Sequence, residues 1–362
     1  MRVTFVIPFA GLQGGIRVVA TYAKRLKQRG HKVTVISTPP DTSVRWKVTS
    51  FVRGGWRNQS QPSHFDKIDV EHLVLEKVRS VTDADVPDSD VVVATYYTTA
   101  YGVQQLSPTK GAKAIFLQGY ELLNAKPNPR LDATWRMPMH KIAVSNWLVQ
   151  LAREKFGDET VSLAPNGVDL DQFHAVPRDK NLVPTVGLLH HNSPLKGCGV
   201  SIKVVRRVAT AIPSLRLVSF GAEQPDFGLR LPRFAEFHHR PPQEKIRDLY
   251  ARCDVWLSAS ILEGFCLPLL EAMACRCPVV STRAGGPMDI IEEGLNGYLT
   301  EVGDVETLAD QVLRVLRLPS KEWRQMSEAA YRTAMRFNWD DATDLFEGAL
   351  ELAMERKRRG EL

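Results

Sequence analysis

The sequence predicts an α/β protein built from two Rossmann-like domains, each with a doubly wound parallel sheet. Its 362 residues exceed the length of one typical domain. Short apolar runs alternate with amphipathic helical segments, which is the pattern of βαβ units. Hydrophobic residues make up 44% and charged residues 24%, as in ordinary globular proteins. Ligands of such folds bind at the carboxyl ends of the strands, so we expect two domains facing a central cleft.

The first domain is expected to begin with a βαβ unit. Residues 2–9 form a continuous apolar run before a glycine-rich turn, which is typical of a buried parallel strand. Residues 16–29 place apolar side chains on one helical face, and residues 32–37 form the next strand. Residues 38–66 lack a clear period and are predicted to be a long functional loop. Further strands are expected at 91–94, 114–117 and 142–144.

The second domain repeats this alternation without any sequence repeat linking the halves. Residues 168–181 contain three aspartates, a proline and few apolar side chains, so we expect the linker there. The predicted domains are therefore residues 1–176 and 177–336, followed by a terminal segment, 337–362. The second domain is expected to contain strands at 185–189, 215–220, 255–258 and 278–281, and helices at 197–211, 243–252, 268–275 and 304–317. Two closing helices are expected at 321–336 and 340–356.

Charge and cysteine content narrow the class of protein. Residues 17–57 carry ten basic side chains and one acid, which favours an anionic acceptor or membrane surface as partner. No apolar stretch reaches the roughly 18 residues of a membrane-spanning helix, and no signal peptide is expected. The odd number of cysteines and the lack of a CxxC pair favour reduced thiols in a cytoplasmic protein. The cysteines are Cys198, Cys253, Cys266, Cys275 and Cys277.

The loop after the strand at 255–258 carries the most specific pattern. Glu263 lies in the loop, Pro268 suits the first helical position, and Glu271 lies one turn into the helix. Free amides at a helix N-terminus form an anion site, and they belong here to residues 265–267. Two acids could hold the hydroxyl groups of a ligand whose phosphates bind those amides. A sugar nucleotide has this chemistry, whereas an ordinary capped helix with surface glutamates is the simpler alternative.

The downstream sequence strengthens this interpretation. Residues 281–299 read as a strand, a Gly-Gly turn, a short Pro-started helix and another strand. These features resemble the C-terminal domain of glycosyltransferase family 4, whose members have the GT-B fold. The family patterns E-x7-E, GG-P and N-G are supplied by Glu263 and Glu271, Gly285-Gly286-Pro287, and Asn296-Gly297. Further matches are Pro165-Asn166-Gly167-Val168-Asp169, Lys196-Gly197, Phe337-Asn338-Trp339 and Gly14-Gly15.

The resemblance implies a retaining sugar transfer from a nucleotide-diphosphate donor, with no metal and no other cofactor. It implies that residues 1–176 face the acceptor, that 177–336 hold the donor, and that the closing helix crosses back onto the first domain. Lys196 would neutralise the leaving diphosphate. The implied catalytic residues are Glu263, Lys196 and Gln118. The implied donor-binding residues are Gly14, Gly15, His191, Lys196, Glu263, Gly264, Phe265, Cys266, Leu267 and Glu271.

The sequence departs from the family pattern at four places. Pro287 is followed by Met288 and Asp289, where the family has a glutamate. His191 stands where the family usually has an arginine, and it could act only as a protonated or a neutral N–H donor. Cys266 replaces a common glycine. Gln118 stands where many members have a histidine, and it cannot be a general base, so Glu121 is a second candidate for acting on the acceptor. The segment 118–121 resembles a bacterial subset that acts in surface-polysaccharide synthesis.

The sequence gives less support to dinucleotide, metal and nucleic-acid sites. No GxGxxG or Walker motif occurs, and paired histidines lack the spacing of a zinc site. The metal-binding form D-x-D occurs three times, in segments that favour solvated acids. Nucleic-acid binding would rest on basic charge alone, so no nucleic-acid partner is expected. The D-x-D segments are 83–85, 88–90 and 169–171.

The sequence therefore predicts a cytoplasmic hexosyltransferase of bacterial cell-surface polysaccharide or glycolipid synthesis. Its partners would be a nucleotide sugar, a glycan or lipid-phosphate-linked acceptor, and the anionic inner face of the cytoplasmic membrane. Two alternatives stay open: another GT-B enzyme, such as an epimerase or phosphorylase, and a non-catalytic nucleotide-sugar-binding subunit. The sugar, the base, the acceptor, the linkage and the oligomeric state are not predicted.

Overall fold

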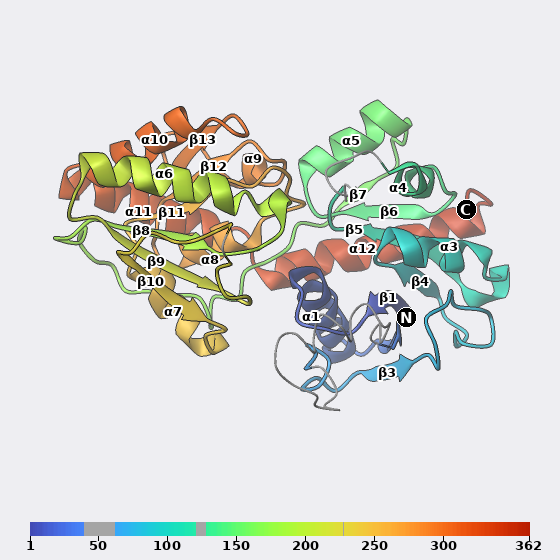
Figure 1. The fold of residues 1–362 in the computed structure, drawn as a ribbon. Helices are drawn as coiled ribbons and strands as arrows, with labels where there is room; N and C mark the ends of the chain where they lie inside the picture. The colour runs from blue at the N-terminus through green and yellow to red at the C-terminus, as the bar shows by residue number, and fades with distance from the viewer. Residues whose placement is uncertain (40–61, 121–127, 227) are drawn as a thin grey trace. The chain divides into compact units, whose positions relative to one another are not determined.

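The computed structural model describes residues 1–39, 62–120, 128–226 and 228–362. The chain divides into two compact units. Each unit contains one parallel sheet with helices packed on it (Figure 1), so the predicted fold class of two Rossmann-like domains is confirmed. Unit 1 comprises Met1–Val144, Val149–Ala164 and Thr343–Leu362, and unit 2 comprises Ser145–Leu148 and Pro165–Ala342.

Unit 1 has a seven-stranded sheet in the order β3-β2-β1-β4-β5-β6-β7. Every neighbouring pair is parallel, and the register pairs Val3 of β1 with Val33 of β2 and Val91 of β4. The strands are β1 (Arg2–Phe9), β2 (Lys32–Thr38), β3 (Glu71–Val74), β4 (Val91–Ala94), β5 (Ala112–Leu117), β6 (His140–Ala143) and β7 (Ser162–Leu163). The helices are α1 (Gly14–Gln28), α3 (Tyr97–Gln105), η1 (Pro108–Lys110), α4 (Pro129–Trp135) and most of α5 (Asn146–Phe156) and α12 (Trp339–Arg358).

Unit 2 has a six-stranded parallel sheet in the order β10-β9-β8-β11-β12-β13. The strand order reverses between β8 and β11, which is where ligands of such sheets bind. The strands are β8 (Thr185–Leu189), β9 (Arg216–Gly221), β10 (Ala235–His239), β11 (Val255–Ser258), β12 (Val279–Thr282) and β13 (Gly297–Thr300). The helices are η2 (Pro194–Lys196), α6 (Cys198–Ala211), α7 (Gln243–Ala251), α8 (Leu267–Ala274), α9 (Pro287–Ile290), α10 (Val305–Arg317) and α11 (Ser320–Met335).

Buried aliphatic side chains hold the helices of unit 2 on its sheet. Val204, Val205 and Val208 of α6 pack with Leu308 and Val312 of α10 over β8 and β11, and all five are fully buried. Their spacing of one, three and four residues places them on one helical face. This packing fixes the ends of β8 and β11, from which the loops of the candidate site begin.

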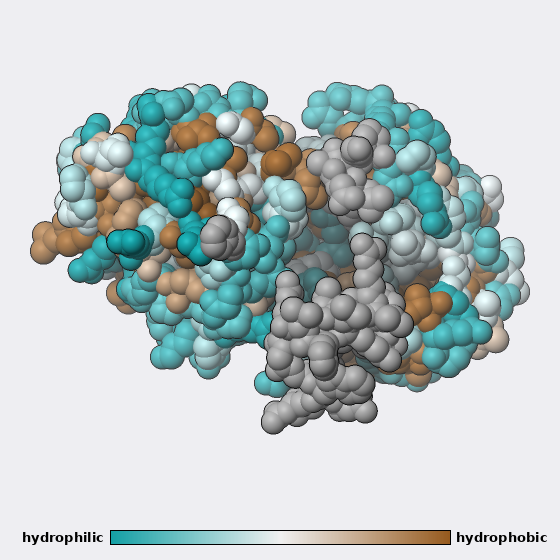
Figure 2. Space-filling model, viewed as in Figure 1, coloured by the Kyte–Doolittle hydropathy of each residue, from teal (hydrophilic) through white to brown (hydrophobic). Residues whose placement is uncertain are grey.

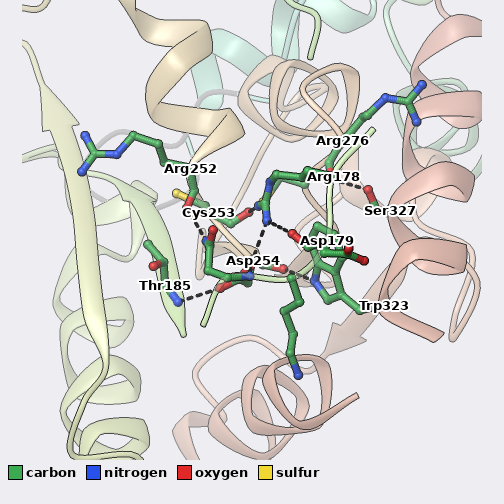
Figure 3. Close-up of polar contacts among 12 residues, drawn as sticks. Arg178, Asp179, Thr185, Arg252, Cys253, Asp254, Arg276, Trp323 and Ser327 are labelled. Atoms are coloured by element: carbon green, nitrogen blue, oxygen red, sulfur yellow. Dashed lines mark hydrogen bonds and ion pairs between the residues drawn. The ribbon is translucent and has the colours of Figure 1, made fainter. Parts of the chain in front are cut away.

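The segment predicted to be a linker is fixed to unit 2. Figure 3 shows Arg178 donating to the carbonyl oxygen of Cys253 and to the carboxylate of Asp254, the latter at 3.2 Å. The carboxylate of Asp254 is fully buried and also accepts the amide of Thr185 at 2.9 Å. The Arg178 guanidinium lies 4.6 Å from the centre of the Trp323 ring. A buried charge with this many partners holds the chain in one conformation.

The boundaries between the two units differ from the predicted ones. Apart from the short excursion at Ser145–Leu148, the passages fall after Ala164 and after Ala342, whereas the divisions were predicted at residues 176 and 336. Residues 165–176 group with unit 2, and Arg276 holds the carbonyl oxygen of Ala175 at 2.9 Å. Composition alone does not reveal this, because the fixing side chains lie far away in the sequence.

Most of the predicted elements agree with the structure to within two residues at each end, but three edge strands, β3, β7 and β10, were missed. β7 has only two residues, too few to form a pattern. β3 is mostly exposed, and β10 carries Glu236, His238 and His239, so neither shows an apolar run. Residues 238 and 239 end β10. The predicted loop at 38–66 lies mainly outside the described residues, as do Arg45, Lys47, Arg53 and Arg57.

The helices of the described part of the chain include none long and apolar enough to cross a membrane. Hydrophilic side chains predominate on the face drawn in Figure 2, apart from small separate apolar patches.

Candidate active site

Loops from two neighbouring strands bring predicted site residues together in unit 2. β8 leads to Lys196, β11 leads to Glu263, and these strands pair directly, with Val186 opposite Val255. Parallel neighbours end at the same edge of a sheet, so their following loops meet. This explains how residues 67 positions apart in the chain come into contact.

Lys196 and Glu263 form a close ion pair. The Lys196 ammonium donates to both carboxylate oxygens of Glu263 at 2.8 Å, and the hydroxyl of Ser260 donates to Oε1 at 2.8 Å. Glu263 is 8% exposed and Ser260 2%. Burial lowers the pKa of Lys196, but the nearby Glu263 carboxylate outweighs this and holds that pKa above its ordinary value. Lys196 is therefore a fixed cation at neutral pH.

Gly197 allows the loop that carries Lys196 to reach this position. Its φ is +58°, and a Cβ there would lie 1.7 Å from the carbonyl oxygen of Ala259. Any side chain at this position would displace the loop after β11. The Lys196-Gly197 pair noted in the sequence is thus required by the close approach of the two loops.

The turn after Glu263 leaves two backbone amides without a backbone partner in the described part of the chain. The carbonyl oxygen of Gly264 accepts the Ser145 hydroxyl at 2.7 Å and the Trp147 indole at 2.9 Å. A trans peptide points its C=O and N–H to opposite sides, so the amide of Phe265 faces away from these donors. Within the described residues, the amides of Phe265 and Cys266 donate to no backbone carbonyl.

α8 begins directly after this turn. Cys266 is its N-cap and adopts a left-handed conformation, with φ 74° and ψ 60°. This conformation suits glycine, which explains the family preference at this position. Pro268 was expected at the first helical position. The helix starts at Leu267, so Pro268 takes the second position. Its missing N–H is harmless at either position, because neither N–H has a partner within the helix. The free amides and the positive end of α8 together favour an anion.

Glu271 lies inside the first turns of α8, as predicted, and is 6% exposed. The hydroxyl of Tyr250, from α7, donates to its Oε2 at 2.9 Å. Glu263 and Glu271 therefore flank the amides at the start of α8, each held by a hydrogen bond from a hydroxyl group. Both glutamates thus stand in the loop and in the helix where the E-x7-E spacing places them, and their roles in ligand binding stay a prediction.

His191 follows β8 in the same loop as Lys196. Its Nδ1 accepts the backbone amide of Ser193 at 2.9 Å, so a neutral ring carries its proton on Nε2. Burial and the positive charge of Lys196 hold the pKa of His191 below its ordinary value. Of the two roles left open by the sequence, the geometry favours the neutral N–H donor.

The Gly-Gly and Asn-Gly patterns have structural roles. A Cβ on Gly286 would lie 2.4 Å from the Cα of Phe265, so this glycine lets the two turns touch. The fully buried Asn296 amide donates to the carbonyl of Ile290 and to the hydroxyl of Thr333, joining α9 to α11. These residues support the turn without belonging to the site itself.

In unit 1, the glycine turn lies close to Gln118. Gly14 and Gly15 open α1, both exposed, and a Cβ on Gly15 would lie 3.3 Å from the Gln118 side-chain oxygen. Gln118 follows β5 and is half-buried. The structure thus brings Gly15 and Gln118 together, whereas Glu121 lies outside the described residues.

The D-x-D acids occupy ion pairs or turns. Asp85 pairs with Arg79, Asp88 with Lys110, and Asp169 accepts backbone amides of its own turn. Among the described residues, no group of three or more His, Cys, Asp or Glu side chains could hold a metal ion.

Sequence reasoning missed four side chains that shape the site: Ser145, Trp147, Tyr250 and Ser260. Each acts through a single hydrogen bond to a residue of the motif or to its backbone. No spacing rule points to them; only Ser260, three residues before Glu263, could have been suggested by proximity.

The sequence of the second unit matches known proteins. Residues 169–333 match the family described as glycosyl transferases group 1. A D-inositol 3-phosphate glycosyltransferase of Mycolicibacterium paratuberculosis is 31% identical over 220 residues, covering 54% of this chain and 48% of that relative. A protein of the same name from Mycobacterium tuberculosis is 31% identical over 223 residues, covering 54% and 45%. The chain thus spans about half the length of the curated relatives it matches.

Solved structures resemble the chain over nearly its whole length. A sucrose-phosphate synthase from Thermosynechococcus elongatus has a TM-score of 0.75 at 15% identity, covering 97% of this chain and 98% of that one. HepE of Anabaena, in complex with UDP-glucose, has a TM-score of 0.73 at 19% identity, covering 97% and 99%. These likenesses concern the fold, and they confirm the predicted GT-B class.

Proposed function

We propose that the chain is a glycosyltransferase that moves a sugar from a nucleoside-diphosphate donor to an acceptor hydroxyl. The observation that carries the proposal is the paired Lys196 and Glu263 beside the free amides of Phe265 and Cys266. Cation, amides and helix N-terminus suit a diphosphate, and the flanking carboxylates suit the hydroxyl groups of a sugar and a ribose. The family match over 169–333 supports the same reaction class.

In the proposed reaction, the bond between the anomeric carbon and the phosphate oxygen breaks, and its electron pair goes to the diphosphate. The new bond joins the anomeric carbon to the acceptor oxygen, whose proton passes to the departing phosphate. Lys196 and the amides stabilise the charge that develops on the diphosphate, which lowers the barrier. Glu263 holds the transferred sugar, and Glu271 holds the ribose of the donor.

We propose further that the reaction proceeds with retention and without a metal, as the resemblance to family 4 implies. His191 supports the diphosphate through its neutral Nε2–H, and Gly14 and Gly15 let the donor approach α1 closely. Gln118 orients a hydroxyl group of the donor or acceptor. An NMR assignment of the anomeric configuration of the product, with and without a chelator, tests both statements.

For the acceptor, we propose a phosphorylated molecule. The mycobacterial relatives are named for D-inositol 3-phosphate, and the basic excess of residues 17–57 suits an anion. Part of that excess is already neutralised, because Lys27 pairs with Asp69 and Arg29 with Asp344 and Glu347. A lipid-phosphate-linked glycan of surface-polysaccharide synthesis, reached at the inner face of the membrane, is the second candidate.

The first experiment is a thermal-shift panel of nucleotide sugars and nucleoside diphosphates on the full chain. A ligand that binds only the folded protein raises the melting temperature by mass action, so the preferred donor stands out. Failure of every compound to shift melting would contradict the proposal.

The second experiment measures turnover with the preferred donor and three acceptor samples: D-inositol 3-phosphate, a lipid-linked phosphate extract, and no acceptor. Product with either acceptor supports a transferase and identifies the acceptor class. Conversion of the donor without acceptor indicates an epimerase, and dependence on inorganic phosphate indicates a phosphorylase. Binding without any conversion indicates a non-catalytic subunit.

The third experiment tests the site with Glu271→Gln. Loss of a buried carboxylate that binds hydroxyl groups should weaken donor binding about tenfold to a hundredfold. Glu322→Gln, on the exposed first turn of α11, is the matched control and should leave binding unchanged. Equal affinities of the two variants would remove Glu271 from the proposed site.

A further inference from the structure

Tyr250 makes a buried contact with Glu271 that no sequence motif records. It lies on α7, its side chain is fully buried, and its hydroxyl donates to Oε2 of Glu271 at 2.9 Å. Glu271 lies on α8, and 6% of it is exposed. A buried hydroxyl bonded to a carboxylate forms a charge-assisted hydrogen bond, which is stronger than a neutral one.

The Tyr250 ring is fixed by aromatic side chains from three other segments. The Trp256 ring of β11 lies 4.4 Å from it, the Phe220 ring of β9 5.5 Å, and the Phe173 ring 6.1 Å, measured between centroids. All three contacts are edge-on, a favourable geometry for aromatic pairs. The ring cannot turn without repacking this cluster, so its hydroxyl has one position relative to α8.

We propose that Tyr250 is a positioning residue that orients the Glu271 carboxylate toward the vicinal hydroxyl groups of the donor ribose, and so sets the preference for ribonucleotides over deoxyribonucleotides. The inference rests on the proposed function. Anchoring Oε2 fixes the plane of the carboxyl group before the ligand arrives, so less conformational freedom is lost on binding. The hydroxyl group of Tyr250 acts through Glu271 and does not contact the donor itself.

The test compares ribonucleotide and deoxyribonucleotide binding to the wild type and to Tyr250→Phe, which removes one oxygen atom and keeps the ring. The probes are UDP, GDP and ADP with their 2′-deoxy counterparts, measured by calorimetry on the full chain. For the ribonucleotide that the wild type prefers, affinity should fall about tenfold, the usual order for a lost hydrogen bond to a charged group. Affinity for its deoxy counterpart should change less than about twofold, so the wild-type preference should collapse.

Tyr298→Phe is the matched control, because this ring is also buried in unit 2 but packs under Arg314, away from the site. It should preserve the ribo/deoxy ratio. If Tyr250→Phe weakens both ligands equally, its effect is general destabilisation and the inference is wrong. If it weakens neither, Tyr250 does not position Glu271. If the wild type binds no nucleoside diphosphate, the proposed function itself fails, which is a distinct result.

Discussion

The carboxyl ends of the two sheets present different kinds of sites. In unit 2, Lys196, Ser260 and Glu263 bond directly to one another, and Tyr250 bonds to Glu271. In unit 1, Gly15 and Gln118 only approach each other, at a glycine turn whose residues are exposed. One region is assembled before any ligand arrives, whereas the other offers open backbone and a half-buried amide.

This difference indicates where binding energy and selectivity arise. A preassembled site binds its ligand with little further ordering, so substitutions there should change affinity or turnover strongly. In an open site the side chains become ordered only when the ligand binds, so each contributes less to affinity. Single substitutions there should therefore have smaller effects. The contrast accords with the proposal that unit 2 holds the donor and that the acceptor lies near unit 1, and the following experiments test it.

The largest effect is expected for Lys196→Ala. Removing the cation that we propose stabilises the departing diphosphate should lower kcat about a hundredfold, with a smaller change in donor affinity. Steady-state kinetics and calorimetry with the donor separate the two quantities. Lys203→Ala, an exposed lysine on α6, is the control and should behave as wild type. A fall in affinity with unchanged kcat would assign Lys196 to ground-state binding.

The next effect concerns the stability of unit 1, which should depend on pH through one buried histidine. His140 of β6 is fully buried, and burial together with the charge of Arg356 lowers its pKa to about 4 from 6.5. The unfolded chain takes up a proton below about pH 6.5 while the folded unit resists until about pH 4, so the free energy of unfolding falls as pH decreases across that window. From about pH 7.5 to about pH 5, the loss should be about 2 kcal/mol in unit 1.

Urea unfolding followed by hydrogen exchange measures this loss for each unit separately. His140→Gln should flatten the difference in unit 1 between the two pH values. His174→Gln, at an exposed histidine of unit 2, should leave it in place. Equal pH dependence in wild type and His140→Gln would show that other groups, such as carboxylates, govern acid sensitivity.

A smaller effect is expected for Gln118→Ala in unit 1. Loss of one neutral hydrogen bond to a substrate hydroxyl should lower kcat/KM for the acceptor about fivefold to tenfold, without a change in nucleoside-diphosphate affinity. Gln105→Ala, at the exposed end of α3, controls for the loss of an amide side chain elsewhere. A hundredfold loss would instead give unit 1 a role as strong as that of Lys196 and would erase the contrast.

The smallest effect concerns the backbone at Cys266. Both Cys266→Gly and Cys266→Ala remove the thiol, but only glycine adopts φ 74° without cost. The glycine variant should therefore be more stable than the alanine variant by about 1 kcal/mol. At Cys198, the first residue of α6, the order should reverse because glycine weakens a helix. Chemical denaturation of the four variants measures their stabilities. If the same residue, glycine or alanine, were the more stable at both positions, the result would argue against the left-handed conformation of Cys266.

The sequence predicted the parts of the site that depend on local patterns and on fold class. The E-x7-E spacing located both glutamates, one before and one after the turn in the chain, and the parallel sheet order brings Lys196 beside Glu263. Tyr250 and Trp147 were not predicted, because each reaches the site through a tertiary contact with no sequence period. The edge strand β3 was not predicted for a related reason: it is mostly exposed, and an exposed strand needs no apolar run.

The grouping of Ser145–Leu148 with unit 2 has a practical consequence for dissecting the protein. These four residues precede the stretch Val149–Ala164 of unit 1 in the chain, yet Ser145 and Trp147 hold the carbonyl oxygen of Gly264. A recombinant piece starting at Pro165 would contain every acid and base of the proposed donor site in unit 2 but would lack both of these supports. Ligand titrations on such a piece should underestimate the affinity of the full-length chain.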